Sequence, residues 1–127
     1  MKTIILTLVT LEGLGSGFVI SNDGDIMTAA HIVQNATMIQ VVFSDGEEVP
    51  AQVLYSYPTA DVALIRLTES KSTPLAVVTL ADSDKVKIGD QVFVIGSPFG
   101  LGHSLSVGYI SGKYSRKQVS SGFIKTE

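Results

Sequence analysis

The feature that most limits how this chain can fold is a succession of short segments rich in β-branched residues, separated by tight turns. Turn signals such as Asn22-Asp23-Gly24 and Ser44-Asp45-Gly46 consist of residues that tolerate a positive φ. Residues 30–34 can form a single helical turn, which is too short to be an independent helix. The predicted strands occupy residues 3–11, 16–21, 26–29, 38–43, 48–55 and 62–67. Six short strands joined by tight turns predict an all-β fold built on a small closed barrel.

Two stretches of this first part restrict the backbone further. Residues 12–15 (Glu-Gly-Leu-Gly) are predicted to form the turn between the first two strands. Pro50 lies inside the fifth predicted strand. Because proline has no N–H to donate to a neighbouring strand, it indicates an edge position or the start of a strand.

The second part of the chain predicts another sheet unit. Residues 69–74 form a polar linker, and the boundary between the parts is expected near residues 69–88. Three further strands are predicted, at residues 91–95, 104–112 and 119–125. We therefore assign residues 1–80 to an N-terminal six-stranded barrel and residues 81–127 to the first strands of a second, incomplete barrel. A chain of 127 residues can bury a core without disulfides or metal ions.

The composition excludes several classes of function. The chain has no cysteine, which rules out a disulfide framework, a thiolate metal site and a cysteine nucleophile. The net charge is -3 with acids and bases intermixed, so no basic stripe points to nucleic acid. The apolar run at residues 3–11 is interrupted by threonines and predicts a strand, with a processed leader peptide as the alternative. This run is far shorter than the roughly 20 apolar residues of a membrane-spanning helix. The rest of the sequence contains no apolar run that exceeds it in length.

A histidine and an aspartate stand at two strand boundaries of the expected barrel. His31 follows the strand at residues 26–29, and Asp61 directly precedes the apolar run at residues 62–67. Histidine can act as a general base near neutral pH, and aspartate can accept the other imidazole N–H and hold the productive tautomer. Taken singly, each has a simpler interpretation, as a capping histidine and as an aspartate that ends a loop. The pair is more informative than either residue alone, so we predict a catalytic pair.

Several stretches together resemble trypsin-like serine proteases, and most closely the bacterial HtrA/Deg branch. The histidine motif of that family is similar to Gly15-Ser16-Gly17-Phe18-Val19-Ile20-Ser21 followed by Thr28-Ala29-Ala30-His31. Its aspartate motif is similar to Asp61-Val62-Ala63-Leu64-Ile65. The opening strands of its second barrel are similar to residues 89–100, 106–111 and 123–126. The resemblance covers nearly the whole chain, with the motifs in the family's order.

This resemblance carries expectations about fold, chemistry and location. It implies a pair of six-stranded antiparallel barrels with the active site between them, His31 as general base and Asp61 as the residue that orients it. It implies a polypeptide substrate, of the unfolded or misfolded kind, and no metal or organic cofactor. An extracytoplasmic location, periplasmic or in the cell envelope, is suggested by the resemblance only.

One part of the family's pattern does not occur in the 127 residues. In the family, the strand similar to residues 123–126 leads into a loop with Gly-Asn-Ser-Gly-Gly, which supplies the nucleophilic serine and the oxyanion hole. Ser16 precedes the histidine strand, Ser97 lies in a Gly-Ser-Pro turn, and Ser120 lies in a turn before the last predicted strand. None of them fits the nucleophile's motif. We therefore expect no proteolysis from this polypeptide alone.

Other candidate sites are weaker. The glycines at positions 13, 15 and 17 precede a strand, whereas a phosphate-binding loop precedes a helix. His103 follows Gly100-Leu101-Gly102 and is interpreted as a loop histidine, with a substrate contact as the alternative. Two histidines far apart in sequence, with no cluster of acids at ligand spacing, do not predict a zinc site.

An incomplete second barrel leaves apolar residues in need of cover. These residues are Val92, Val94, Leu105, Val107, Tyr109 and Ile124. Because exposed strand edges and apolar patches recruit partners, we expect strand exchange between chains, a homo-oligomer, or disorder beyond about residue 88.

Two other interpretations of the function remain. The chain could be a non-catalytic pseudoprotease whose barrel binds peptides or a protein partner. It could also be an N-terminal piece that must be complemented in trans by the missing segment. The DNA after codon 127 separates a fragment from a pseudoprotease, since a continuing frame that encodes Gly-Asn-Ser-Gly-Gly indicates the former and a stop codon the latter.

Overall fold

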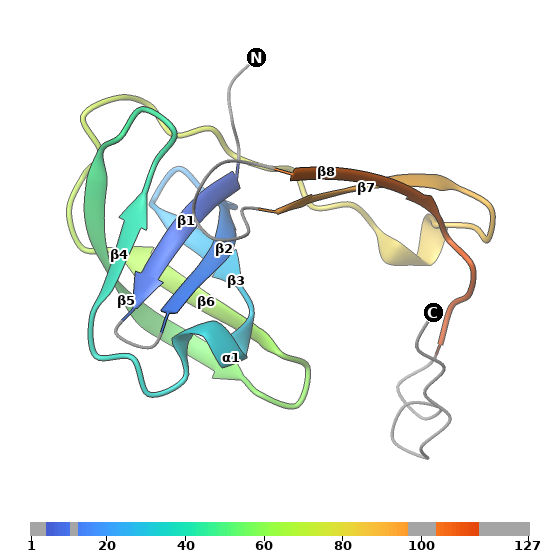
Figure 1. The fold of residues 1–127 in the computed structure, drawn as a ribbon, viewed down its shortest axis with the longest axis horizontal. Helices are drawn as coiled ribbons and strands as arrows, with labels where there is room; N and C mark the ends of the chain where they lie inside the picture. The colour runs from blue at the N-terminus through green and yellow to red at the C-terminus, as the bar shows by residue number, and fades with distance from the viewer. Residues whose placement is uncertain (1–4, 11–12, 97–103, 115–127) are drawn as a thin grey trace. The chain divides into compact units, whose positions relative to one another are not determined.

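The structure, a computed structural model, describes residues 5–10, 13–96 and 104–114 (Figure 1). The first part of the chain contains β1 (Ile5–Thr10), β2 (Gly13–Val19), β3 (Asp25–Thr28), α1 (Ala30–Val33), β4 (Ile39–Val42), β5 (Glu48–Tyr57) and β6 (Val62–Leu67). The second part contains the 3₁₀ turn η1 (Ser83–Lys85), β7 (Gln91–Gly96) and β8 (Ser104–Tyr109). The chain divides into two compact units, of which the first includes Met1–Leu80 and the second includes Ala81–Val94.

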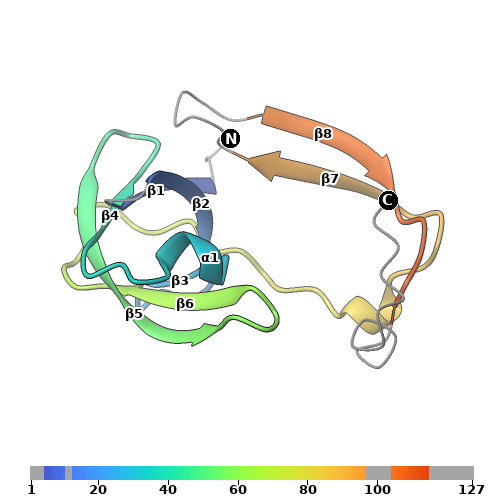
Figure 2. The same ribbon diagram turned by 60° about the horizontal axis from the view of Figure 1, so that its bottom comes forward.

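The six strands of the first unit form a closed antiparallel barrel with the order β1-β2-β3-β6-β5-β4. Closure comes from the pairing of β1 with β4, in which Leu8 lies opposite Val41. Figure 2 shows these strands curving around a shared interior, with α1 near one end of the barrel. The all-β prediction and the predicted closed barrel are confirmed.

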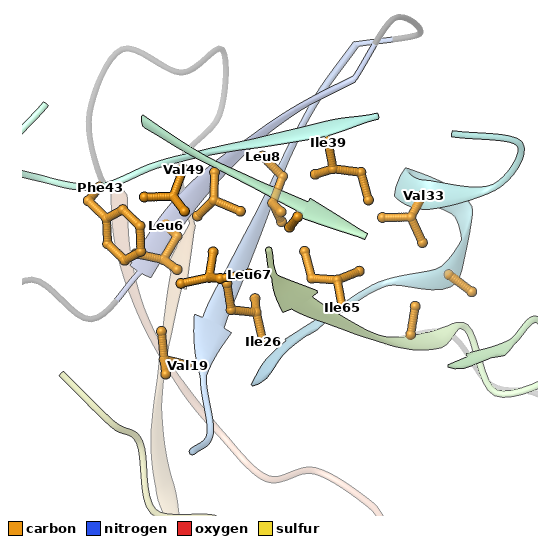
Figure 3. Close-up of a cluster of buried hydrophobic side chains, with 14 residues drawn as sticks. Leu6, Leu8, Val19, Ile26, Val33, Ile39, Phe43, Val49, Ile65 and Leu67 are labelled. Atoms are coloured by element: carbon orange, nitrogen blue, oxygen red, sulfur yellow. The ribbon is translucent and has the colours of Figure 1, made fainter. Parts of the chain in front are cut away.

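The barrel interior is filled by alternate residues of every strand (Figure 3). Leu8, Ile26, Val41, Ala63 and Ile65 have no exposed surface. Each fully buried Val, Leu or Ile side chain contributes about 1.5–3 kcal/mol relative to an exposed one. The period of two in the burial of β3 and β4 matches the alternation expected of strands that have one face in the core.

Two details differ from or refine the sequence-based expectations. Residues 13–15 were predicted to lie in a turn, but β2 already begins at Gly13, because the hairpin with β1 continues to the pair Thr10 and Gly13. Pro50 is the third residue of β5, so it lies near a strand start, in a strand that has a neighbour on each side. Its carbonyl accepts a hydrogen bond from the Thr68 N–H at 2.9 Å.

The second sheet is partial, as predicted. Among the residues that the structure describes, β7 and β8 pair only with each other. Strand β8 ends at Tyr109 rather than at residue 112, and the Ile110 N–H donates to the Asp90 carbonyl at 2.9 Å. The strand predicted at residues 119–125 lies outside the described residues. In the described part of the chain, no helix has the length and apolar character needed to cross a lipid bilayer.

Candidate active site

The pairing of β3 with β6 explains why two residues thirty positions apart in sequence meet. The two strands are antiparallel, and Thr28 at the end of β3 lies opposite Ala63 near the start of β6. The residues that follow β3 and those that precede β6 therefore emerge at the same end of the barrel. His31 belongs to the first group and Asp61 to the second.

His31 belongs to a single helical turn whose position is fixed by the strand before it and by its own buried residues. Strand β3 ends at Thr28, a buried residue whose Oγ1 donates to the Ser16 carbonyl at 2.7 Å. Helix α1 follows directly, and its residues Ala30 and Val33 are buried in the core. The His31 side chain lies on the outer side of this turn and is 65% exposed. The backbone is therefore fixed while the imidazole remains accessible to a reactant.

Asp61 occupies an unusual backbone conformation. The chain turns after β5, with the Asp61 N–H donating to the Pro58 carbonyl at 3.1 Å. The φ of Asp61 is +54°, in the left-handed region that few residues other than glycine adopt. Aspartate is among the residues that tolerate it. This turn directs the carboxylate back toward α1.

Both carboxylate oxygens of Asp61 are engaged by His31. The His31 backbone N–H donates to Oδ1 at 2.9 Å, and the His31 Nδ1 lies 2.8 Å from Oδ2. Because an ionised carboxylate only accepts hydrogen bonds, Nδ1 carries the proton in the neutral ring and Nε2 is left as an acceptor. The structure thus brings together the two residues that the sequence analysis paired, in the tautomer that a general base requires.

The electrostatics of the pair favour an ionised Asp61. The His31 backbone N–H and then the His31 ring hold the pKa of the Asp61 carboxyl below its ordinary value, with a smaller contribution from the Ala30 N–H. No side chain within α1 caps its first turn. Asp61, in the turn between β5 and β6, therefore also caps α1. A structural role of Asp61 and a catalytic one are compatible, since a single carboxylate contacts both the helix N-terminus and the ring.

Of the other candidate residues, Ser16 lies in the part of the chain that the structure describes. Ser16 lies within β2, where its carbonyl accepts the bond from Thr28. Ser97, His103 and Ser120 fall outside the described residues. Within the described ranges, no group of three or more histidine, aspartate or glutamate side chains is placed to hold a metal ion. The anchoring role of Thr28 was not predicted from the sequence, although Thr28 opens the Thr-Ala-Ala-His motif.

One hollow on the barrel lies away from the His31–Asp61 pair. A hollow of about 540 Å³ lies between the β2–β3 turn, which contains Asp23, and residues 67–75. This turn and the end of β6 lie at the opposite ends of β3 and β6 from His31 and Asp61. The chemistry of the pair, rather than the size of a cavity, therefore locates the candidate site.

A comparison with known sequences defines the class of protein. The sequence model of the trypsin-like peptidase domain matches residues 15–127. The chain belongs to the trypsin-like peptidase family.

Curated relatives of this chain include periplasmic serine endoproteases of the DegP type. A probable periplasmic serine endoprotease of the DegP-like type from Pseudomonas putida (strain GB-1) is 45% identical over 102 residues, which is 80% of this chain and 21% of that protein. The periplasmic serine endoprotease DegP of Escherichia coli (strain K12) is 41% identical over 99 residues, covering 77% of this chain and 20% of the relative. The chain thus spans about a fifth of the length of these relatives.

The fold is similar to that of a solved protease of the same branch. The structure of the HtrA-type protease AlgW with a tripeptide matches with a TM-score of 0.75 and 34% sequence identity. The match covers 86% of this chain and 36% of the AlgW chain. The resemblance inferred from the sequence motifs is confirmed.

Proposed function

We propose that this chain supplies the general base and its orienting carboxylate to a serine endopeptidase that acts on polypeptides. The observation that carries this proposal is the double contact of Asp61 with His31, in which one oxygen accepts the backbone N–H and the other faces Nδ1. A carboxylate that only capped the helix would not need to engage the ring. Membership of the trypsin-like peptidase family supports the same chemistry.

In this proposal the proton moves through His31 Nε2. As a serine hydroxyl oxygen attacks the carbonyl carbon of a peptide bond, Nε2 takes the hydroxyl proton and the ring becomes an imidazolium. Asp61 stabilises that cation through Nδ1–H and keeps the ring in place. Nε2 then returns the proton to the leaving amine as the C–N bond breaks. Water, activated by the same nitrogen, releases the acyl group and restores the serine.

The nucleophile in this proposal comes from outside the 127 residues. The motif Gly-Asn-Ser-Gly-Gly does not occur in the sequence, and no serine here matches it. A triad acts as a unit, and loss of one member leaves only about 10³–10⁴-fold catalysis over water from the oxyanion hole and substrate binding, a range known from serine proteases themselves. Without the oxyanion-hole segment, even that remainder is not expected from the isolated polypeptide.

The test compares the 127-residue polypeptide with the protein expressed from its full reading frame. We expect the former to leave casein intact and to resist labelling by a serine-directed fluorophosphonate. We expect the latter to hydrolyse casein and to lose this activity in His31→Ala. The matched control is Asp23→Asn, an exposed turn residue at the other end of β3, which should retain activity. Labelling of the short polypeptide, or full activity in His31→Ala, would contradict the proposal.

A stop codon directly after codon 127 would favour the alternative function. The chain would then be a non-catalytic pseudoprotease that binds peptides or a protein partner. The absence of the nucleophile motif from the 127 residues is the observation that keeps this alternative. A pseudoprotease would bind an unfolded polypeptide without cleaving it, which the casein assay combined with a binding measurement distinguishes.

The comparison supports a proposal about location, and the exposed sheet supports one about a partner. The described relatives are called periplasmic, and we propose an extracytoplasmic location for this protein as well.

The large apolar side chains of β7 and β8 are exposed, among them Phe93, Val94, Leu105, Val107 and Tyr109. We propose that in the 127-residue polypeptide this sheet is covered by a second copy of the chain.

A further inference from the structure

One contact between β2 and α1 leaves no room for a side chain on β2. At Gly15, an added Cβ would overlap the Cγ2 atom of Ile32 and would lie 2.9 Å from its Cγ1 and 3.0 Å from its Cδ1. Gly15 does not have a positive φ, so its backbone is one that any residue can adopt. The requirement at this position is therefore for space and not for conformational freedom.

Ile32 is the residue next to the proposed base. It belongs to α1, packs against the buried core, and its backbone N–H donates to the Ala29 carbonyl at 3.2 Å. Helix α1 has only four residues, and a single helical turn is not stable by itself. The orientation of α1, and hence of His31, must therefore come from the packing of its side chains and from the Asp61 carboxylate.

We infer that Gly15 is a positioning residue for His31, because its missing side chain lets Ile32 seat α1 against β2 where the imidazole meets Asp61. This inference rests on the proposed function only for its consequence in catalysis. The geometric part, that Gly15 sets the His31–Asp61 contact, stands on the packing alone. A displacement of catalytic groups by about 1 Å can cost about 10²-fold in rate.

The test is a pair of substitutions that create and then remove the clash. Gly15→Ala should displace Ile32 and weaken the bonds from His31 to Asp61. The double variant Gly15→Ala/Ile32→Ala lacks all three crowding atoms of Ile32. It should therefore restore the bonds from His31 to Asp61. Because the His31 N–H and ring lower the pKa of Asp61, this pKa should rise in Gly15→Ala and return in the double variant. The Asp61 carboxyl carbon shift, followed by NMR against pH in the 127-residue polypeptide, reports it.

Two matched controls separate positioning from a general loss of stability. Gly17→Ala on the same strand would crowd the side chains of Leu8 and Ile26 and the Met27 carbonyl at 2.9–3.0 Å, and none of these three nearest atoms belongs to α1. It should lower stability while the folded fraction keeps the Asp61 titration of the parent. Gly108→Ala on β8 meets nothing within 4 Å and should change neither.

The activity of the full-reading-frame protein gives the second readout. Gly15→Ala should lower kcat by about 10²-fold with little change in KM, and the double variant should recover most of that loss. An unchanged Asp61 titration in Gly15→Ala overturns the inference. A double variant that does not regain the parent's Asp61 titration and kcat overturns it as well, and this second outcome can be measured even if Gly15→Ala alone does not fold. If the titrations behave as expected but His31→Ala remains active, the proposed function fails and the positioning role stands.

Discussion

At the scale of single residues, the candidate site depends on one carboxylate with two tasks. Asp61 accepts from the His31 backbone and faces the His31 ring, in a left-handed conformation that its neighbours impose. The sequence predicted that these two residues form a pair, and their catalytic roles stay a prediction. It could not predict the φ of +54° or the capping of α1, because both depend on where the turn after Tyr57 places the carboxylate.

Asp61→Asn should separate the two tasks. Asparagine also tolerates the left-handed region, and its side-chain oxygen can still accept the His31 N–H, so the fold should persist. Its amide cannot act as the acceptor for Nδ1–H if its NH₂ faces the ring, which favours the tautomer that is wrong for a base. In the full-reading-frame protein, kcat should fall by about 10⁴-fold, the factor established for serine proteases as the reference case.

The measurement is steady-state peptide hydrolysis, combined with circular dichroism to follow folding. Asp23→Asn serves as the control for replacing an exposed aspartate outside the site. Activity within about tenfold of the parent in Asp61→Asn would show that Asp61 only caps the helix, since loss of the orienting carboxylate costs far more.

At the scale of elements, the neighbours β3 and β6 create the site. The sequence predicted both strands from their apolar runs and turns, and α1 as a single turn. It could not show that β3 pairs with β6, because three other elements intervene and the order follows from closure of the barrel. The predicted start of β2 at residue 16 was also wrong, because glycines that suggest a turn occur equally in a strand that packs closely against a neighbour. Gly15 is such a case.

An ion pair joins the other ends of these two strands and predicts a dependence of stability on pH. Asp25 lies opposite Arg66, and Arg66 Nε donates to its Oδ1 at 2.7 Å. The Arg66 side chain, followed by the Ser21 hydroxyl and opposed by partial burial, holds the pKa of Asp25 below its ordinary value of 3.8. The stabilisation is therefore complete above the unfolded pKa and is lost as the pH falls through the folded one.

The comparison is between the parent and Asp25→Asn in urea unfolding from pH 7 to pH 2. The parent should have the higher urea midpoint above about pH 5, and the difference should shrink as the pH falls below 3.8. High salt should reduce the difference at pH 7, because Arg66 is 45% exposed and the pair is screened. A difference that stays constant down to pH 2 would show that ionisation of Asp25 does not stabilise the barrel.

At the scale of the whole molecule, the two parts of the chain differ in how much apolar surface they cover. The barrel buries its core completely, and residues such as Leu8 and Ile65 have no exposed surface. In the second sheet, Phe93 and Leu105 are 59% and 63% exposed. The sequence predicted this contrast from the number of strands, because three strands cannot close a barrel. The sequence left open whether strand exchange, a homo-oligomer or disorder accounts for the second sheet, since the chain matches only about a fifth of the length of its relatives.

The exposed sheet gives a prediction for the 127-residue polypeptide in solution. A two-stranded sheet is marginal in water, and apolar patches with free strand edges favour association. We expect light scattering after size exclusion to give at least the mass of a dimer at micromolar concentration. Replacing Val94 and Val107 by serine should shift the polypeptide to the monomer, because both side chains are more than half exposed on β7 and β8. Leu80→Ser, at an equally exposed residue outside the sheet, should leave the dimer intact. A monomeric parent whose β7 and β8 amides are protected from hydrogen exchange would show that the sheet is stable without a second copy.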